Sequence, residues 1–447
     1  MVARLVIAGT SSGAGKTTVA TGLMAALAAR GERPAGFKVG PDFIDPSYHA
    51  LATGRPGRNL DAFLSGPELI APLVRHGARD SGIAVVEGVM GLYDGASGRG
   101  ELASTAHVAK LLGAPVVLVI DAAAMARSVA AIAHGYRSFD PDVDVAGVVL
   151  NRVGSPAHAG LLRDALAPLG LPVLGALPRD PELAVPERHL GLVPVAERGA
   201  RARAVVDRLA ATIAAHCDVD GLVALARGAG ERPGAAWSPE GAPPGPAVRV
   251  AVARGPAFSF HYEENLELLA AAGAELEPFD PLSDETLPAD AGALLLAGGF
   301  PEVFGAELSA NAALRAEIAA FARSGRPVLA ECGGLLYLAA ELDGRAMCGV
   351  LDVRAAMGER LALGYREATA AADHPVWPTG TAVRGHEFHY SRVTPAAGAP
   401  AAWALRGRGA EGHVAGGVHA SYLHTHWAAT PAVARRLVDA AARELVA

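Results

Sequence analysis

The sequence predicts an α/β fold in two consecutive units, and three observations support this. Short, continuous apolar runs alternate with helical stretches along the 447 residues, and such runs are typical of parallel strands buried on both faces. Hydrophobic residues make up 51% of the chain and charged residues 19%, which allows large buried cores. Residues 228–247 are rich in Gly and Pro without periodicity, which indicates a linker.

The linker divides the chain into a first domain at residues 1–227 and a second at residues 248–447. The expected strands of the first domain lie at residues 4–9, 83–88, 115–122, 145–153 and 172–177. Those of the second domain lie at residues 248–253, 291–299 and 326–334.

Composition excludes several classes of partner. The formal charge of −7 and the absence of a Lys/Arg run argue against a nucleic-acid surface. No apolar run reaches the roughly 20 residues that span a bilayer, and the N-terminus lacks a secretory pattern. The three cysteines are too few for a disulfide framework and lack metal-ligand spacing. We therefore expect a cytoplasmic protein with neither nucleic-acid nor membrane partners.

A phosphate-binding loop follows the first strand. The segment from Gly9 to Thr18 is Gly-rich and leads into a helical stretch that ends near Arg30. Such a loop directs backbone N–H groups and the positive helix end at phosphates. Lys16 would reach the β- and γ-phosphates, and the Thr17 hydroxyl would ligate Mg²⁺. The strict pattern has glycine at position 10, where this chain has Thr, but the strand–loop–helix context supports nucleotide binding.

Carboxylates follow two further strands of the first domain. Glu87 ends the run at residues 83–87, where a Walker-B carboxylate would hold Mg²⁺, and Asp94 lies on the adjoining loop. Ligands bind at this carboxyl edge of parallel sheets. The segment from Lys38 to Pro46 holds one lysine and two carboxylates among Gly and Pro. It either positions a metal and a phosphoryl group or forms an Asx-capped turn.

The second domain contains a cysteine at a strand–helix turn. Cys332 follows the apolar run at residues 328–330 and precedes two glycines, so a sharp turn would expose a nucleophile there. The helix N-terminus is expected to lower the pKa of the thiol. Cys217 and Cys348 lack such a setting and are expected to be core residues.

A thiol nucleophile needs a base, and the sequence offers several histidines. His419, His424 and His426 would share one face of a regular strand, so their spacing does not choose between them, and His389 is a further candidate. The turn at Gly298-Gly299 could direct backbone N–H groups at an oxyanion.

Six motifs together resemble the cobyrinic acid/hydrogenobyrinic acid a,c-diamide synthases, in the family's order and over almost the whole chain. They lie at residues 9–18, 38–46, 87–95, 294–304, 330–338 and 420–427. The resemblance implies a P-loop domain similar to dethiobiotin synthetase, with a mostly parallel sheet, followed by a class I glutamine amidotransferase-like α/β domain.

The implied reaction is the ATP- and glutamine-dependent amidation of the a and c side-chain carboxylates of a corrin-ring precursor. ATP would form an acyl phosphate, and ammonia released from glutamine would pass internally to displace phosphate. The resemblance assigns the nucleophile to Cys332, its base to His424 and the oxyanion hole to Gly298, Gly299 and Gly333. The high-GC bias and the ending at residues 420–427 favour hydrogenobyrinic acid over cobyrinic acid.

The resemblance also assigns the residues of the first domain. ATP would be bound by Ser12, Gly13, Ala14, Gly15, Lys16, Thr17, Thr18 and Lys38, with Asn151 reading adenine. Mg²⁺ would be held by Thr17, Asp45 and Glu87. Carboxylate activation is assigned to Asp42, Phe43, Ile44, Asp45 and Asp94.

Two departures and several alternatives remain. Many class I amidotransferases place Glu where this chain has His426, so a Cys–His dyad is expected. Partition-type ATPases carry a second lysine where this chain has Ser11. The alternatives are a cobyric acid synthase-like amidase, a degenerate amidotransferase half, and a partition-type ATPase or metal-chaperone GTPase, which would have no use for Cys332. The oligomeric state, including a homodimer, is left open.

Contacts to the macrocycle are not assigned by any motif. Arg55, Arg58 and Arg99 lie on expected loops near the motifs of the first domain. In the second domain, residues 258–265 would either face the substrate or simply begin a helix.

Overall fold

The computed structural model describes residues 2–180, 187–188, 191–192, 195–197, 199–239 and 247–444. The chain divides into two compact units, Met1–Ser238 and Pro239–Ala447, called the first and second unit below. Among the described residues, no helix combines the length and the apolar character that crossing a membrane requires.

The first unit is built on a parallel sheet. Within its described residues, seven strands run in the order β3-β2-β4-β1-β5-β6-β7, and every neighbouring pair is parallel. The strands are β1 (Ala3–Gly9), β2 (Pro34–Val39), β3 (Arg58–Leu60), β4 (Ile83–Glu87), β5 (Val116–Asp121), β6 (Val145–Val153) and β7 (Val173–Pro178). β4 is buried along its whole length and β1 almost so, as the predicted continuous apolar runs require.

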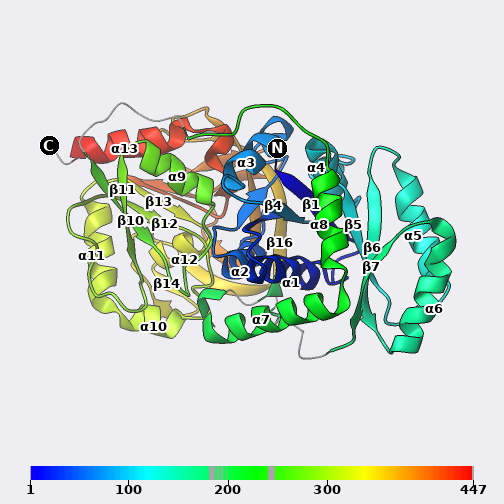
Figure 1. Cartoon of the computed structure of the whole chain (residues 1–447). Coiled ribbons are helices and arrows are strands. Elements are labelled where there is room, and N and C mark those ends of the chain that lie inside the picture. The colour runs from blue at the N-terminus through cyan, green and yellow to red at the C-terminus, as the bar shows by residue number, and fades with distance from the viewer. Residues whose placement is uncertain are drawn as a thin grey trace. The chain divides into compact units, whose positions relative to one another are not determined.

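Helices connect these strands and cover both faces of the sheet. They are α1 (Lys16–Ala29), α2 (Ile44–Thr53), α3 (Pro67–Gly77), α4 (Thr105–Leu112), α5 (Ser128–Phe139), α6 (Pro156–Leu166), α7 (Gly199–His216) and α8 (Val219–Gly228). Figure 1 shows α1, α2 and α7 packed together, while α3 packs on α4 at the opposite face. A short hairpin of β8 (Glu187–Arg188) and β9 (Gly191–Leu192) lies outside the main sheet.

The predicted linker begins as part of the first unit. Residues 229–239 form neither helix nor strand, but the ring of Trp237 is buried and contacts His76 edge-on at 4.9 Å. The backbone N–H of Trp237 also donates to Pro72 O at 2.9 Å. Residues 240–246 of the predicted linker lie outside the described residues.

The second unit also contains a largely parallel sheet. Between residues 247 and 444, six strands run in the order β11-β10-β12-β13-β21-β20, with only β20 antiparallel to its neighbour. They are β10 (Val248–Ala253), β11 (Ala274–Phe279), β12 (Ala291–Leu296), β13 (Val328–Glu331), β20 (His413–Ala415) and β21 (Val418–Ser421).

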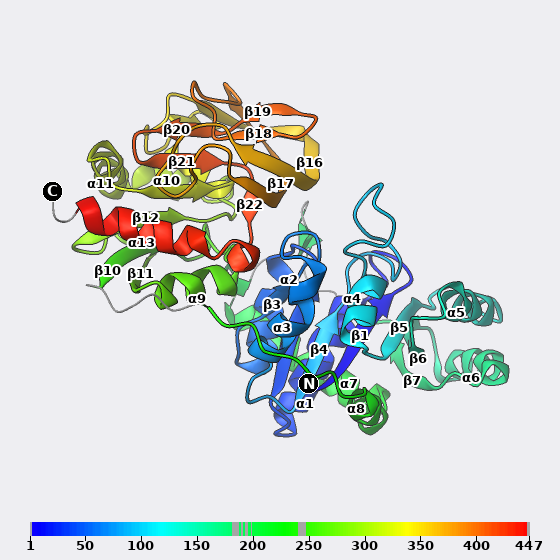
Figure 2. The same cartoon turned by 90° about the horizontal axis from the view of Figure 1, so that it is seen from above.

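Helices lie on both faces of this second sheet. Figure 2 shows α9 (Glu263–Ala271) and α13 (Ala432–Glu444) side by side on one face. On the other side lie α10 (Gly305–Ala310) and α11 (Ala312–Arg323), and α12 (Gly333–Leu338) packs against β13.

A further sheet of the second unit was not predicted. Its main part is an antiparallel hairpin of β16 (Arg354–Ala370) and β17 (Ala382–Thr394), extended by β14 (Glu341–Leu342), β15 (Arg345–Ala346) and β22 (His424–Thr425). β18 (Trp403–Leu405) and β19 (Gly409–Glu411) join it at β16. The register shifts between Met357 and Ala362, so β16 bulges there.

Candidate active sites

The phosphate-binding loop connects β1 to α1 through glycines in left-handed conformations. Gly13 and Gly15 have φ angles of 76° and 101°, which side chains with a Cβ rarely adopt. The Asn151 side-chain amide donates to Ala14 O at 3.0 Å, and a Cβ on Gly15 would lie 2.0 Å from the same nitrogen. Asn151 therefore supports the loop backbone, and its contact with adenine remains a prediction.

Lys16 lies folded over this loop. Its ammonium group donates to Ser11 O at 2.9 Å and to Met90 O at 2.6 Å. Burial and the positive charge of Lys38 lower the pKa of Lys16 to about 8. A phosphate in the loop would supply the negative charge that the two carbonyl groups lack.

Glu87 is the centre of a buried polar cluster at the end of β4. Its Oε1 accepts hydrogen bonds from the Thr17 hydroxyl at 2.6 Å and from Lys38 Nζ at 2.8 Å. Its Oε2 lies 2.7 Å from His49 Nε2. Burial alone would raise the pKa of Glu87, but Lys38 and His49 more than offset this and hold it well below its usual range. The carboxylate is therefore ionised.

The segment from Lys38 to Asp45 links this cluster to the start of α2. Lys38 Nζ forms an ion pair with Asp45 at 2.5 Å, while burial and the charge of Glu87 raise the pKa of Asp45. Asp42 Oδ1 accepts hydrogen bonds from the backbone N–H groups of Ile44 and Asp45 at 2.6 and 3.0 Å. The predicted Asx-capped turn thus exists, and it begins a helix that places Asp45 against Lys38.

Two further residues complete this edge of the sheet. Asp94 Oδ2 accepts from the Gly91 backbone N–H at 3.0 Å, which fixes the loop after β4. His49 was missed by the sequence reasoning. It lies four residues after Asp45 on α2, and this spacing, which places both side chains on one helix face, was the signal that could have found it.

The first unit fits Mg²⁺ bound together with a nucleotide. No group of three or more His, Cys, Asp or Glu side chains in the described part of the chain forms a preformed metal cage. Mg²⁺ does not need one, because it usually binds one or two carboxylates together with substrate phosphates and water. Thr17 and Glu87, in contact beside the phosphate loop, are suitable ligands.

Cys332 occupies a strained turn between β13 and α12. Its φ and ψ angles are 48° and −98°, and φ is positive in few residues other than glycine. The side chain is buried. Burial and the negative charge of Glu302 raise the pKa of the Cys332 thiol, so the predicted lowering by the helix N-terminus was wrong. Deprotonation of Cys332 therefore needs a base.

The three C-terminal histidines do not lie on one continuous strand. β21 ends at Ser421, and His424 begins β22, which pairs with β17 of the other sheet. This break places the ring of His424 against Gly298, one of the predicted oxyanion glycines. A Cβ on Gly298 would lie 2.4 Å from His424 Cε1. Burial lowers the pKa of His424 to about 3, so its ring is neutral, and the imidazolium formed on accepting a proton is disfavoured by burial.

The predicted oxyanion glycines lie together beside this ring. A Cβ on Gly333 would lie 3.0 Å from the backbone N of Gly299. Gly333 directly follows Cys332, and Gly298 touches His424. The structure thus brings Cys332, His424 and the three glycines to one place.

The other candidate bases lie in different surroundings. His419 contacts Trp403 edge-on at 4.9 Å within a buried aromatic cluster. His426 Nε2 lies 3.4 Å from Glu264 Oε2, and His389 stacks on Tyr422 at 3.6 Å. These contacts leave His424 as the best candidate for the base.

Residues 258–265 hold the histidine segment in place. The Tyr262 hydroxyl lies 2.9 Å from His386 Nε2, and the His386 ring stacks on His424 with centroids 4.9 Å apart. Asn265 donates to Thr425 O at 2.9 Å. The segment begins α9, and through Tyr262 and His386 it supports the ring of His424. The sequence did not indicate this role.

The three arginines considered for the macrocycle differ in exposure. Arg58 is buried in β3. Arg55 donates to Arg79 O at 2.6 Å, and the exposed Arg99 lies over the ring of Phe63 at 5.3 Å. The expected loop position is therefore confirmed for Arg55 and Arg99 and was wrong for Arg58, which begins β3.

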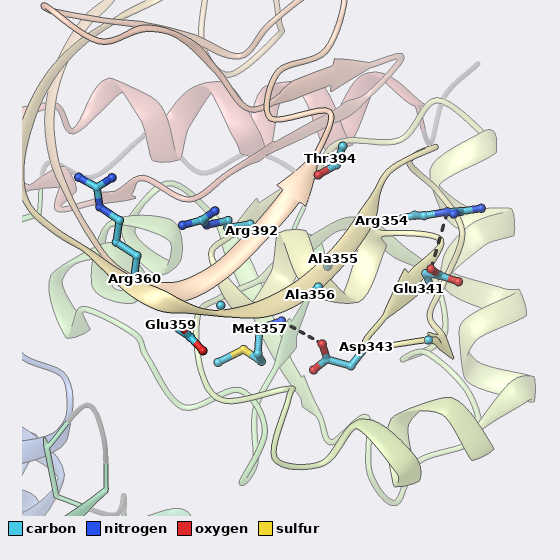
Figure 3. Close-up of a pocket in the computed structure, with 12 residues that line it drawn as sticks. Glu341, Asp343, Arg354, Ala355, Ala356, Met357, Glu359, Arg360, Arg392 and Thr394 are labelled. Carbon is cyan, nitrogen blue, oxygen red and sulfur yellow. Dashed lines mark hydrogen bonds and ion pairs between the residues drawn. The ribbon is translucent and has the colours of Figure 1, made fainter.

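A cavity of about 650 Å³ lies where β16 bulges in the second unit. Figure 3 shows Arg360 and Arg392 at one end of it and Glu341 and Asp343 at the other. Glu341 pairs with Arg354 at 3.7 Å. Acidic and basic side chains line the cavity in similar number, so its charge does not identify a ligand.

Comparison with known proteins identifies both units. Residues 5–193 match the model of the CobQ/CobB/MinD/ParA nucleotide binding domain family, and residues 249–432 match that of the CobB/CobQ-like glutamine amidotransferase domain family. The fold class predicted from the sequence is confirmed.

Curated relatives match along nearly the whole chain. A hydrogenobyrinate a,c-diamide synthase from Streptomyces coelicolor is 58% identical over 98% of this chain and 97% of its own. One from Mycobacterium tuberculosis is 51% identical over 99% of this chain and 98% of its own. A cobyrinate a,c-diamide synthase from Gloeobacter violaceus is 47% identical over 97% of this chain and 96% of its own.

Proposed function

Because the chain belongs to the family of hydrogenobyrinate and cobyrinate a,c-diamide synthases, we propose that it converts the a and c side-chain carboxylates of a corrin precursor into carboxamides, using ATP and glutamine. The observation that carries this proposal is the presence of two half-sites in one chain. The first unit holds Lys16 and Glu87 beside a phosphate loop, and the second holds Cys332 and His424 beside three glycines.

The second unit would release ammonia from glutamine. His424 takes the proton of Cys332, and the Cys332 sulfur attacks the carboxamide carbon. The backbones of Gly299 and Gly333 lie close together, and their N–H groups would stabilise the oxyanion that forms. His424 then donates the proton to the leaving ammonia, and water hydrolyses the thioester to glutamate.

The first unit would activate the substrate carboxylate. A carboxylate oxygen attacks the γ-phosphorus of ATP and ADP leaves, which gives an acyl phosphate. Ammonia then attacks the acyl carbon and phosphate leaves, which gives the amide. The phosphate loop and Lys16 would bind the phosphates, and Thr17 and Glu87 would hold Mg²⁺, which would neutralise phosphate charge when bound. Lys38 would bind the ATP phosphates by exchanging its ion pairs with Asp45 and Glu87 for an ion pair with a phosphate oxygen.

Hydrogenobyrinic acid, the cobalt-free precursor, is the proposed preferred substrate. The relatives at 58% and 51% identity are named for hydrogenobyrinate, whereas the relative at 47% identity is named for cobyrinate. This order of identities supports the preference predicted from the ending at residues 420–427.

Mass spectrometry of each acid after incubation with the protein, Mg-ATP and glutamine tests the proposal. The expected result is a diamide, formed faster from hydrogenobyrinic acid. With ¹⁸O in the substrate carboxylates, the acyl phosphate route predicts ¹⁸O in the inorganic phosphate released. Glutamine and ATP hydrolysis without any amidated corrin would refute the assigned substrate but leave both half-sites in place.

A further inference from the structure

The Cys332–His424 pair has a carboxylate beside it that no motif assigned. Glu331 is the last residue of β13 and directly precedes Cys332. Its Oε2 lies 3.8 Å from Nδ1 of His424, and the His424 side chain is only 2% exposed. A base that becomes charged in so buried a site gains from a nearby negative charge.

One oxygen of Glu331 is held in place while the other faces the imidazole. Oε1 accepts hydrogen bonds from the backbone N–H of Thr425 at 3.2 Å and from its hydroxyl at 2.7 Å. These two bonds fix the carboxyl plane and leave Oε2 on the side of His424. The sequence separation of 94 residues between Glu331 and Thr425 explains why no sequence motif shows this contact.

The two hydrogen bonds from Thr425 to Glu331, called the Glu331 clamp below, are themselves held in place by neighbouring side chains. The Thr425 hydroxyl accepts a hydrogen bond from the indole N–H of Trp427 at 2.9 Å, which orients its own proton towards Glu331. Asn265 accepts from the Trp427 backbone N–H at 2.8 Å and donates to Thr425 O at 2.9 Å. Side chains locked in this way are typical of groups that orient a catalytic residue.

Other buried carboxylates of the second unit have different tasks. Glu264 faces His426 at 3.4 Å, and Glu387 forms a buried ion pair with Arg366 at 2.6 Å. Glu411 accepts from the Ser421 hydroxyl and the Tyr422 backbone N–H at 2.6 and 2.9 Å. Each of these contacts stabilises the surrounding structure and leaves Glu331 as the acid that faces Nδ1 of His424.

We propose that Glu331 is the positioning residue of the glutamine-hydrolysing site, acting through His424. It would accept a hydrogen bond from the Nδ1–H of His424, so that Nε2 carries no proton and can take that of Cys332, and its charge would stabilise the imidazolium. The gap of 3.8 Å would close when the imidazolium forms, since catalytic hydrogen bonds often tighten only in the transition state. The inference rests on the proposed glutamine hydrolysis.

The protonation of Glu331 depends on the charge of His424. Burial raises its pKa to about 7, because desolvation disfavours the charged form. A proton arriving on His424 would reverse that preference, since an adjacent positive charge favours the carboxylate.

The test compares Glu331→Gln with the wild-type chain in two assays, glutamine hydrolysis and ammonia-driven amide synthesis. The amide oxygen of Gln can still accept from Thr425, while its NH2 group, in the place of Oε2, removes both the charge and the acceptor for the Nδ1–H of His424. The expected result is a kcat for glutamine lowered roughly 10²–10⁴-fold, with KM within a few-fold and the ammonia-driven rate unchanged. Glu331→Asp, which keeps the charge, is expected to recover part of the lost kcat.

A matched control separates this effect from a general one. Glu341→Gln removes an exposed carboxylate of the same unit that pairs with Arg354 and should change neither rate. A kcat for Glu331→Gln within about threefold of wild type, or equal losses in both assays, would overturn the proposal. If Glu331→Gln does not fold, Glu331→Ala takes its place: a kcat for glutamine within about threefold of wild type would overturn the proposal, and a loss confined to the glutamine assay would support it.

The same experiment distinguishes this inference from the proposed function. Cys332→Ala should lack glutamine hydrolysis whatever Glu331 does. Loss in Cys332→Ala with full activity in Glu331→Gln would therefore remove the inference alone. Full glutamine hydrolysis in Cys332→Ala would remove both.

Discussion

The backbone N–H of Cys332 donates a hydrogen bond of 2.7 Å to the carbonyl oxygen of Ser421. This bond extends the pairing of β13 with β21 by one step, beyond the register pair of Glu331 and Ser421. The chain then needs only two residues to reach His424. The positions of Cys332 and His424 are therefore determined by the register of β13 and β21. Substitutions beside these two residues should affect glutamine hydrolysis specifically.

Substitution of Gly298 by Ala is expected to displace His424. The new Cβ would lie 2.4 Å from His424 Cε1, which forces the ring to move, and misplacement of a catalytic group by about 1 Å can cost on the order of 10²-fold in rate. Glutamine hydrolysis should fall by about that factor while ammonia-driven synthesis persists. Gly305→Ala is the control, because its Cβ would meet nothing closer than 3.5 Å. Equal rates in the two variants would show that His424 does not act in the reaction.

Substitution of Lys16 by Ala is expected to stop amide synthesis from either nitrogen source. Lys16 is the cation of the phosphate loop, and loss of a preorganised charge at a transferring phosphoryl group costs roughly 10²–10³-fold. Product formation with glutamine and with ammonium should both fall by at least that amount. Lys110→Ala, which removes a lysine paired with Asp140 at 2.9 Å, should leave both rates intact. Normal synthesis by Lys16→Ala would place ATP elsewhere.

His419 is expected to make stability depend on pH. Burial lowers its pKa from 6.5 to about 3 in the folded chain, so below pH 6.5 only the unfolded chain takes up this proton. The stabilisation is present above the unfolded pKa and is lost as pH falls. Between about pH 7.5 and about pH 5 the loss is on the order of 2 kcal/mol. In urea unfolding, the free energy of unfolding of His419→Leu should fall less between these pH values than that of the wild type, by this amount. Equal falls in the two chains would contradict the low pKa of His419.

The parallel strands were predictable from the sequence, whereas the antiparallel hairpin was not. β4 and β12 are buried along their whole lengths, so their residues form unbroken apolar runs. β16 is exposed over much of its length and bulges between Met357 and Ala362. Its sequence therefore shows neither a continuous apolar run nor a regular alternation.

The site was predictable where one short motif holds the chemistry. The phosphate loop and the turn at Cys332 are local, and the structure brings their predicted partners Glu87 and His424 to them. The Glu331 clamp depends on a contact between distant segments, which a single sequence does not show. The predicted low pKa of the Cys332 thiol was wrong because burial outweighs the short helix that follows it.

The most direct test of the account follows the nitrogen atom. Hydrogenobyrinic acid is incubated with Mg-ATP and glutamine labelled with ¹⁵N in its side-chain amide, using the wild-type chain and Cys332→Ala, with Cys217→Ala as the control. We expect a diamide labelled at both amides from the wild type and the control. Cys332→Ala should form no diamide with glutamine alone and an unlabelled diamide once unlabelled ammonium is added. Labelled diamide from Cys332→Ala with glutamine alone would contradict the account.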